Sequence, residues 1–115
     1  MPADPTRLQI VVRILDDATL LRLSGELDTE SATALLDEAD RLLGQGQRNL
    51  ILDCAALSFC DSSGLRAMTQ VRDQVQPDGS VTIARPSALL LRILQITGLA
   101  ACFLIPAGRA EAPAP

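Results

Sequence analysis

The apolar residues of this chain switch repeatedly between the two-residue period of a strand and the 3.6-residue period of a helix. Residues 8–15 and 18–24 are typical of strands, and Asp16 and Asp17 between them predict a hairpin turn. Residues 30–43 repeat their apolar positions at helical intervals, which are Ala32, Leu35, Leu36, Ala39, Leu42 and Leu43. This alternation predicts an α/β fold, with helices packed against a mixed, mostly parallel sheet that begins with a β-hairpin.

The rest of the chain continues the same alternation. The next elements are predicted in the order strand, helix, strand, helix, strand, at residues 49–54, 62 to about 75, 80–84, 86 to 98 and 102–105. The full order is therefore ββαβαβαβ. The run 49–54 is mostly apolar, as expected for a strand that is covered on both faces and ends near Asp53. We expect one domain, residues 8–105, between flexible tails at residues 1–7 and 106–115.

Composition excludes several classes of function. The net charge is −4, and the two aromatic residues, Phe59 and Phe103, offer little for base stacking, so we expect no nucleic-acid partner. The chain has no His, which removes the Ser-His-Asp triad and imidazole metal ligands, and no Lys for a phosphate-binding loop. Asp53 and Asp61 alone are too few ligands for a metal ion. We therefore expect no cofactor and no metal site.

Cysteine usage and apolar run length bear on location. Three cysteines without C-x-x-C spacing argue against a disulfide framework and fit the reducing cytoplasm. The N-terminal residues show no basic region followed by an apolar stretch, as a secretory signal would. The apolar runs are too short to span a bilayer. We therefore expect a cytoplasmic protein that does not insert into membranes.

The segment 50–65, LILDCAALSFCDSSGL, carries the functional information. In it a buried strand and a loop lead to Asp61, Ser62, Ser63 and Gly64, which open a helix whose first N–H groups lack helical partners. Gly64 has no side chain, so we expect a partner's atoms to approach the backbone there. The partial positive charge of a helix N-terminus also suits a phosphate.

Three roles for the serines are open from the residues alone. Spacing favours Ser62 as an ordinary N-cap. Ser62 or Ser63 as the nucleophile of a small hydrolase would need a base, and neither His nor Lys is present. The third role is a phosphoacceptor for a separate kinase. Arg66 lies one helical turn beyond Ser62, within reach of a partner or of a phosphate.

Four segments in order give the chain a family resemblance. They are LSGELD at 23–28, LILD at 50–53, FCDSSGL at 59–65 and LQITGL at 94–99. Over residues 8–105 the chain resembles the STAS-domain anti-sigma-factor antagonists of bacterial partner-switching systems. The resemblance implies the STAS fold and a regulatory phosphoprotein without enzyme activity of its own.

The same resemblance implies residue roles and partners. Ser62 falls on the family's phosphoacceptor, Asp61 and Gly64 on the flanking motif positions, and Asp28 on the acidic residue of the partner-binding face. The implied partner is an anti-sigma factor with serine kinase activity, bound while Ser62 is unphosphorylated, and a serine phosphatase resets the switch. The alternative is a STAS accessory subunit of a transporter or stress-signalling complex. The residues alone also leave Ser63 open as the acceptor.

Overall fold

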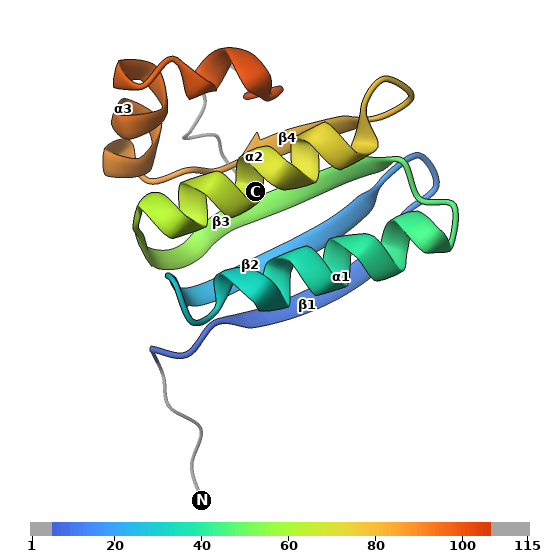
Figure 1. Ribbon diagram of the computed structural model, residues 1–115, viewed down its shortest axis with the longest axis horizontal. Coiled ribbons are helices and arrows are strands. Elements are labelled where there is room, and N and C mark those ends of the chain that lie inside the picture. Colours follow the sequence, from blue (N-terminus) through green and yellow to red (C-terminus); the bar gives the residue numbers. More distant parts are fainter. Residues whose placement is uncertain (1–5, 107–115) are drawn as a thin grey trace, which may run out of the picture.

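The fold is built on a four-stranded sheet in the order β1-β2-β3-β4 (Figure 1). The structure is a computed structural model and describes residues 6–106. Strand β1 (Gln9–Ile14) pairs antiparallel with β2 (Thr19–Leu27), whereas β3 (Asn49–Cys60) and β4 (Ser80–Ala84) join in parallel. The predicted α/β class, N-terminal hairpin and mostly parallel sheet are confirmed. The predictions for residues 1–5 and 107–115 concern parts of the tails outside the described residues.

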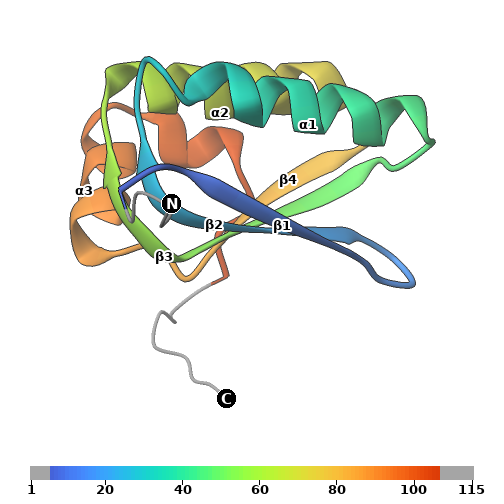
Figure 2. The same cartoon turned by 90° about the horizontal axis from the view of Figure 1, so that it is seen from below.

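Two long helices cover one face of this sheet. Helix α1 (Ala32–Gly44) and helix α2 (Ser62–Val75) lie side by side on that face in both views (Figures 1 and 2). Helix α3 (Ala88–Ile96) lies beside the end of β3 and leads into a 3-10 turn, η1 (Leu99–Cys102). Within residues 6–106 no helix covers the other face. The expectation that residues 49–54 are covered on both faces is therefore wrong.

The core lies between the sheet and the two long helices. Strand β2 alternates buried and more exposed residues, because successive side chains point to opposite faces. Full burial of one Leu or Val contributes about 1.5–3 kcal/mol, so this layer is the main source of stability. The largest fully buried side chains of the sheet and of the helices are apolar. They include Leu21, Leu23, Leu50, Leu52 and Ile83 from the sheet, and Leu35, Leu42, Met68 and Val71 from the helices.

Two strands run further than predicted. Strand β2 continues through Gly25 to Leu27, and β3 continues past Asp53 to Cys60. Gly25 has a φ of +93°, and a Cβ there would lie 2.5 Å from the Arg7 carbonyl oxygen, so glycine lets the chain N-terminal to β1 pack against β2. The Glu26 amide donates to the Thr6 carbonyl at 2.9 Å. Register shifts after Arg22 and Gly25 then carry the β2–β3 pairing onward.

The predicted final strand at residues 102–105 is wrong in extent. Residues Leu99–Cys102 form the 3-10 turn instead. Only Leu104 pairs with the sheet, where its amide donates to the Val81 carbonyl at 2.9 Å and its carbonyl accepts from the Ile83 amide at 2.8 Å. Pro106 has no amide hydrogen, so it cannot donate a further ladder bond.

Candidate functional site

The start of α2 is capped by Asp61. Its backbone is extended, with φ −96° and ψ −171°, and its Oδ1 accepts a hydrogen bond from the Gly64 amide at 3.0 Å. This is the geometry of an N-cap residue, whose side chain satisfies one of the unpaired amides of the first turn. The hypothesis that Ser62 is the N-cap is therefore wrong, because Asp61 already fills that position.

Ser62 and Ser63 lie in different surroundings. Ser62 is the first residue of α2; it is exposed, and its hydroxyl has no hydrogen-bond partner among residues 6–106. Ser63 is half-buried, and its Oγ lies 3.0 Å from the Thr29 Oγ1 in the loop between β2 and α1. The Ser63 hydroxyl thus joins the start of α2 to that loop, whereas the Ser62 hydroxyl faces solvent.

Gly64 is buried against the chain's own backbone. A Cβ at this position would lie 2.8 Å from the Leu27 carbonyl oxygen, from the Leu27 Cγ and from the Cys60 Sγ. Such distances are too short for ordinary contact, so glycine is required for α2 to approach the end of β2. The close approach expected from a partner at Gly64 is therefore made by β2 itself, and Gly64 positions the helix.

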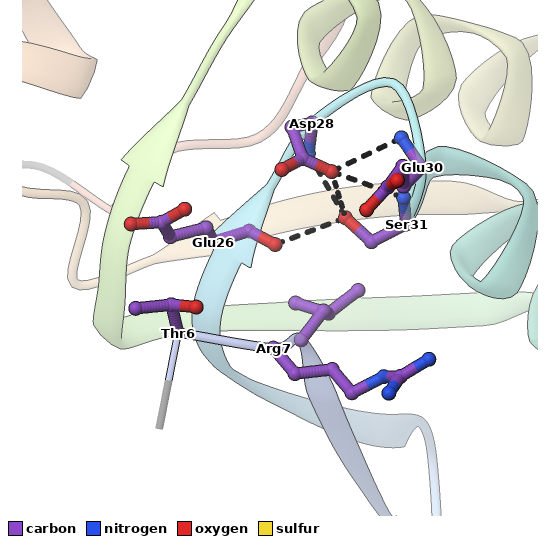
Figure 3. Close-up of a pocket in the computed structure, with 7 residues that line it drawn as sticks. Thr6, Arg7, Glu26, Asp28, Glu30 and Ser31 are labelled. Carbon is purple, nitrogen blue, oxygen red and sulfur yellow. Dashed lines mark hydrogen bonds between the residues drawn. The ribbon is translucent and has the colours of Figure 1, made fainter. Parts of the chain in front are cut away.

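Asp28 holds together the loop between β2 and α1. Its Oδ1 accepts from the amides of Glu30 and Ser31 at 3.1 Å, and its own amide donates to the Ser31 Oγ at 2.9 Å (Figure 3). No hydrogen bond from residues 6–106 reaches its second oxygen, Oδ2, and the residue is half-buried. Because Thr29 of the same loop contacts Ser63, the Asp28 loop adjoins the start of α2. The predicted residues Asp28, Asp61, Ser62 and Ser63 therefore belong to one region.

Two hollows flank this region. One is polar, about 200 Å³ in volume, and lies beside the Asp28 loop (Figure 3). Its lining includes Arg7, Glu26, Asp28, Glu30 and Ser31. The other is mainly apolar, about 190 Å³, and lies between the end of β3 and α3. Its lining includes Leu57, Phe59, Cys60, Leu89 and Ile93.

Arg66 is exposed on α2, and no ion pair joins it to a described residue. It is therefore free to meet a charge near Ser62.

Burial, together with the neighbouring Asp61 carboxylate, raises the pKa of the Cys60 thiol to about 11. The thiol is therefore protonated near neutral pH, and a protonated thiol is a poor nucleophile.

Among residues 6–106 no three His, Cys, Asp or Glu side chains gather as a metal site would need. The Asp53 carboxylate pairs with Arg85 and Arg22 on the uncovered face of the sheet, the face that no helix of residues 6–106 covers. No helix in the described range is long and apolar enough to cross a bilayer.

Sequence reasoning missed two residues of the region, Thr29 and Ser31. Asp28 and Ser31 exchange hydrogen bonds, since the amide of each donates to the side chain of the other. Their three-residue spacing resembles a capping box and was visible in the sequence. The Thr29 contact with Ser63 spans 34 residues, and no local pattern signals it.

The model of the STAS domain family matches residues 9–112, and the chain belongs to this family. Several solved structures share the fold. An anti-sigma factor antagonist from Mycobacterium paratuberculosis aligns with a TM-score of 0.80 at 20% identity, covering 93% of this chain and 92% of the other. The Bacillus cell fate determinant SpoIIAA in its phosphorylated form aligns with a TM-score of 0.68 at 22% identity, covering 88% and 92%.

A STAS domain protein from Planctomyces limnophilus gives a TM-score of 0.69 at 18% identity, covering 89% of this chain and 92% of the other. At such identities the likeness establishes the fold. The chain is thus a STAS domain with the architecture of the anti-sigma factor antagonists.

Proposed function

We propose that this protein is an anti-sigma-factor antagonist whose binding is controlled by phosphorylation of Ser62. The observation that carries the proposal is the contrast between the two serines. The Ser62 hydroxyl is exposed and unpaired in the described structure, whereas the Ser63 hydroxyl is held by Thr29. An incoming kinase would therefore find Ser62 available without breaking any contact of the fold. Membership of the STAS family and the solved phosphorylated form of SpoIIAA support the same reading.

A phosphate on Ser62 would change the fold little. It adds a charge of about −1.5 to −2. The N-terminus of α2 stabilises that charge by about 0.3–1 kcal/mol. The neighbouring Asp61 carboxylate repels it by roughly 1 kcal/mol where both face water. These effects nearly cancel, so we expect the same backbone before and after phosphorylation.

The same phosphate would act strongly at an interface. A partner packed over Ser62 would remove water from the phosphate and from the acids beside it, Asp61 and Asp28. A penalty of about 3–4 kcal/mol weakens binding roughly several-hundred-fold. The switch therefore lies in the chemistry of the surface, while the scaffold stays fixed.

The proposed partner is an anti-sigma factor with serine kinase activity, and a serine phosphatase would restore the unmodified form. The contact surface comprises Asp28, Asp61, Ser62 and Arg66, with Ser63 and Gly64 holding its geometry. In this role the protein is a substrate and a ligand in the cytoplasm rather than an enzyme, and it regulates sigma-factor-dependent transcription. Its apolar hollow beside Cys60 would take an apolar side chain of the partner.

Phosphorylation mapping tests the assignment of the acceptor. The protein would be incubated with ATP and the serine-kinase anti-sigma factors of its own organism, and phosphate located by mass spectrometry. We expect phosphate on Ser62, full labelling of Ser63→Ala, and no labelling of Ser62→Ala. Labelling that persists in Ser62→Ala and disappears in Ser63→Ala would contradict the assignment. Absence of labelling by every such kinase would contradict the proposed switch.

A further inference from the structure

The uncovered face of the sheet carries an ordered set of outward side chains. Helices α1 and α2 both lie on the opposite face (Figure 2). The strand register places the outward residues in two rows across the sheet, Val11–Arg22–Asp53–Ala84 and Arg13–Leu20–Ile51–Thr82. Leu104 extends the second row through its bridge to Thr82. Arginines and aliphatic side chains therefore share one surface.

Cationic groups outnumber carboxylates in these two rows and at Arg85 beside them. Asp53 is the one carboxylate in the two rows, and it is only 3% exposed. Arg85 donates to its two oxygens from Nε at 3.2 Å and from Nη2 at 2.6 Å, and the Arg22 Nε lies 3.5 Å from Oδ2. Arg13 adds a third guanidinium and is exposed. The two rows and Arg85 thus carry three guanidinium groups against one carboxylate, although the chain as a whole has a net charge of −4.

The guanidinium groups keep free donors. The side chains of Arg22 and Arg85 remain about half exposed while they pair with Asp53. The shortest contact between Arg22 and Asp53 is from Nε, and neither Nη group of Arg22 donates a hydrogen bond to residues 6–106. Arg85 also has a φ of +52°, a left-handed conformation that is unfavourable for a residue with a side chain. The fold therefore accepts a strained backbone where an arginine is displayed on this face.

We propose that this face binds an acidic segment of a partner protein. Carboxylates of the segment would pair with Arg13 and with the free Nη groups of Arg22, and apolar side chains would pack on Val11 and Leu104. These two residues are 56% and 58% exposed. Opposite charge favours such an occupant over a second copy related by two-fold symmetry, which would set arginine against arginine.

A nucleic acid would also meet the arginines, but neither row contains an aromatic side chain on which bases stack. The inference does not depend on Ser62, because α2 lies on the covered face.

Site-specific crosslinking tests the proposal. The full chain would carry a photo-crosslinking amino acid in place of Val11, or in place of the exposed Gln74 on α2 as the control, in cells of its own organism. We expect capture at position 11 of a protein segment rich in Asp and Glu, and no capture of that segment at position 74. The captured protein would then be purified and its affinity measured.

We expect Arg13→Glu to weaken this affinity at least tenfold, and rising salt to weaken it further. Arg48→Glu makes the same charge change at an exposed position outside the two rows and should alter the affinity less than twofold. Ser62→Asp should leave it unchanged, which separates this surface from the proposed switch. The proposal is overturned by no capture at position 11, by capture of nucleic acid or of a segment without acids, or by unchanged affinity in Arg13→Glu.

Discussion

Asp61 and Ser62 are neighbours, but only Asp61 supports the fold of α2, through its hydrogen bond from the Gly64 amide. Asp61→Ala removes that bond and leaves the amide unsatisfied. We expect it to lower the free energy of unfolding by about 0.5–2 kcal/mol, measured by chemical denaturation. Ser62→Ala is the matched control and should change stability by less than about 0.5 kcal/mol, because its hydroxyl is exposed and unpaired. The reverse order of the two losses would show that Ser62 is the cap.

The sequence could locate this helix start but could not divide the roles within it. Asp and Ser are both good N-cap residues, and the choice depends on which of them has the extended backbone at the boundary. Likewise, no local pattern shows that Thr29 holds Ser63. The family resemblance selected Ser62 as the acceptor, and this stays a prediction. The structure shows that Ser62 is exposed, whereas the Ser63 hydroxyl contacts Thr29.

The packing of α2 against β2 depends on Gly64. A Cβ there would lie 2.8 Å from the Leu27 carbonyl oxygen, and backbone cannot easily move aside. We expect Gly64→Ala to lower the free energy of unfolding by about 1–3 kcal/mol and to shift the NMR signals of the residues around Ser62. Gly44→Ala, at the end of α1, meets nothing within 4 Å and should be neutral or slightly stabilising. Equal stabilities for the two variants would contradict the close approach of α2 to β2.

Periodicity predicted the helices and the central strands well, because these elements bury one regular face. It failed where pairing is decided across the chain. Residues 55–60, AALSFC, lack a regular pattern. Their strand exists because Leu57 pairs with β2 after one register shift, and Phe59 and Cys60 pair with it after a second. The run CFLI at 102–105 has strand-like composition, but only Leu104 pairs with the sheet. The ion pair between Asp53 and Arg85 likewise joins residues that lie 32 positions apart, so no local pattern predicts it.

The ion pairs of Asp53 make the stability of the whole domain sensitive to acid. Burial alone raises the pKa of Asp53, but hydrogen bonds from Arg85 and the Ala55 amide, with the charges of Arg85 and Arg22, lower it below its ordinary value of 3.8. As the pH falls through 3.8, Asp53 therefore becomes protonated in the unfolded chain, whereas in the folded chain it stays ionised down to a lower pH. The stabilisation is complete above that pH and is lost as the pH falls through the lowered folded value.

Denaturation measured between pH 7 and pH 2 tests this dependence. We expect Asp53→Asn to lower the free energy of unfolding at pH 7 by about 1–3 kcal/mol and to flatten its decline below pH 4. Asp40→Asn, at an exposed position without an ion pair in the described structure, should follow the wild-type curve. An Asp53→Asn curve parallel to that of the wild type throughout would contradict the role given to the ion pairs.

The molecule as a whole combines a fixed STAS scaffold with a hydroxyl that meets solvent at the start of α2. Its proposed regulation requires that a phosphate on Ser62 change the binding surface and little else. The most direct test is calorimetric titration of the anti-sigma factor with the unmodified protein and with protein phosphorylated on Ser62. We expect the phosphorylated form to bind roughly several-hundred-fold more weakly, with unchanged NMR signals outside the start of α2 and the Asp28 loop. Equal affinities for the two forms would contradict the proposed switch.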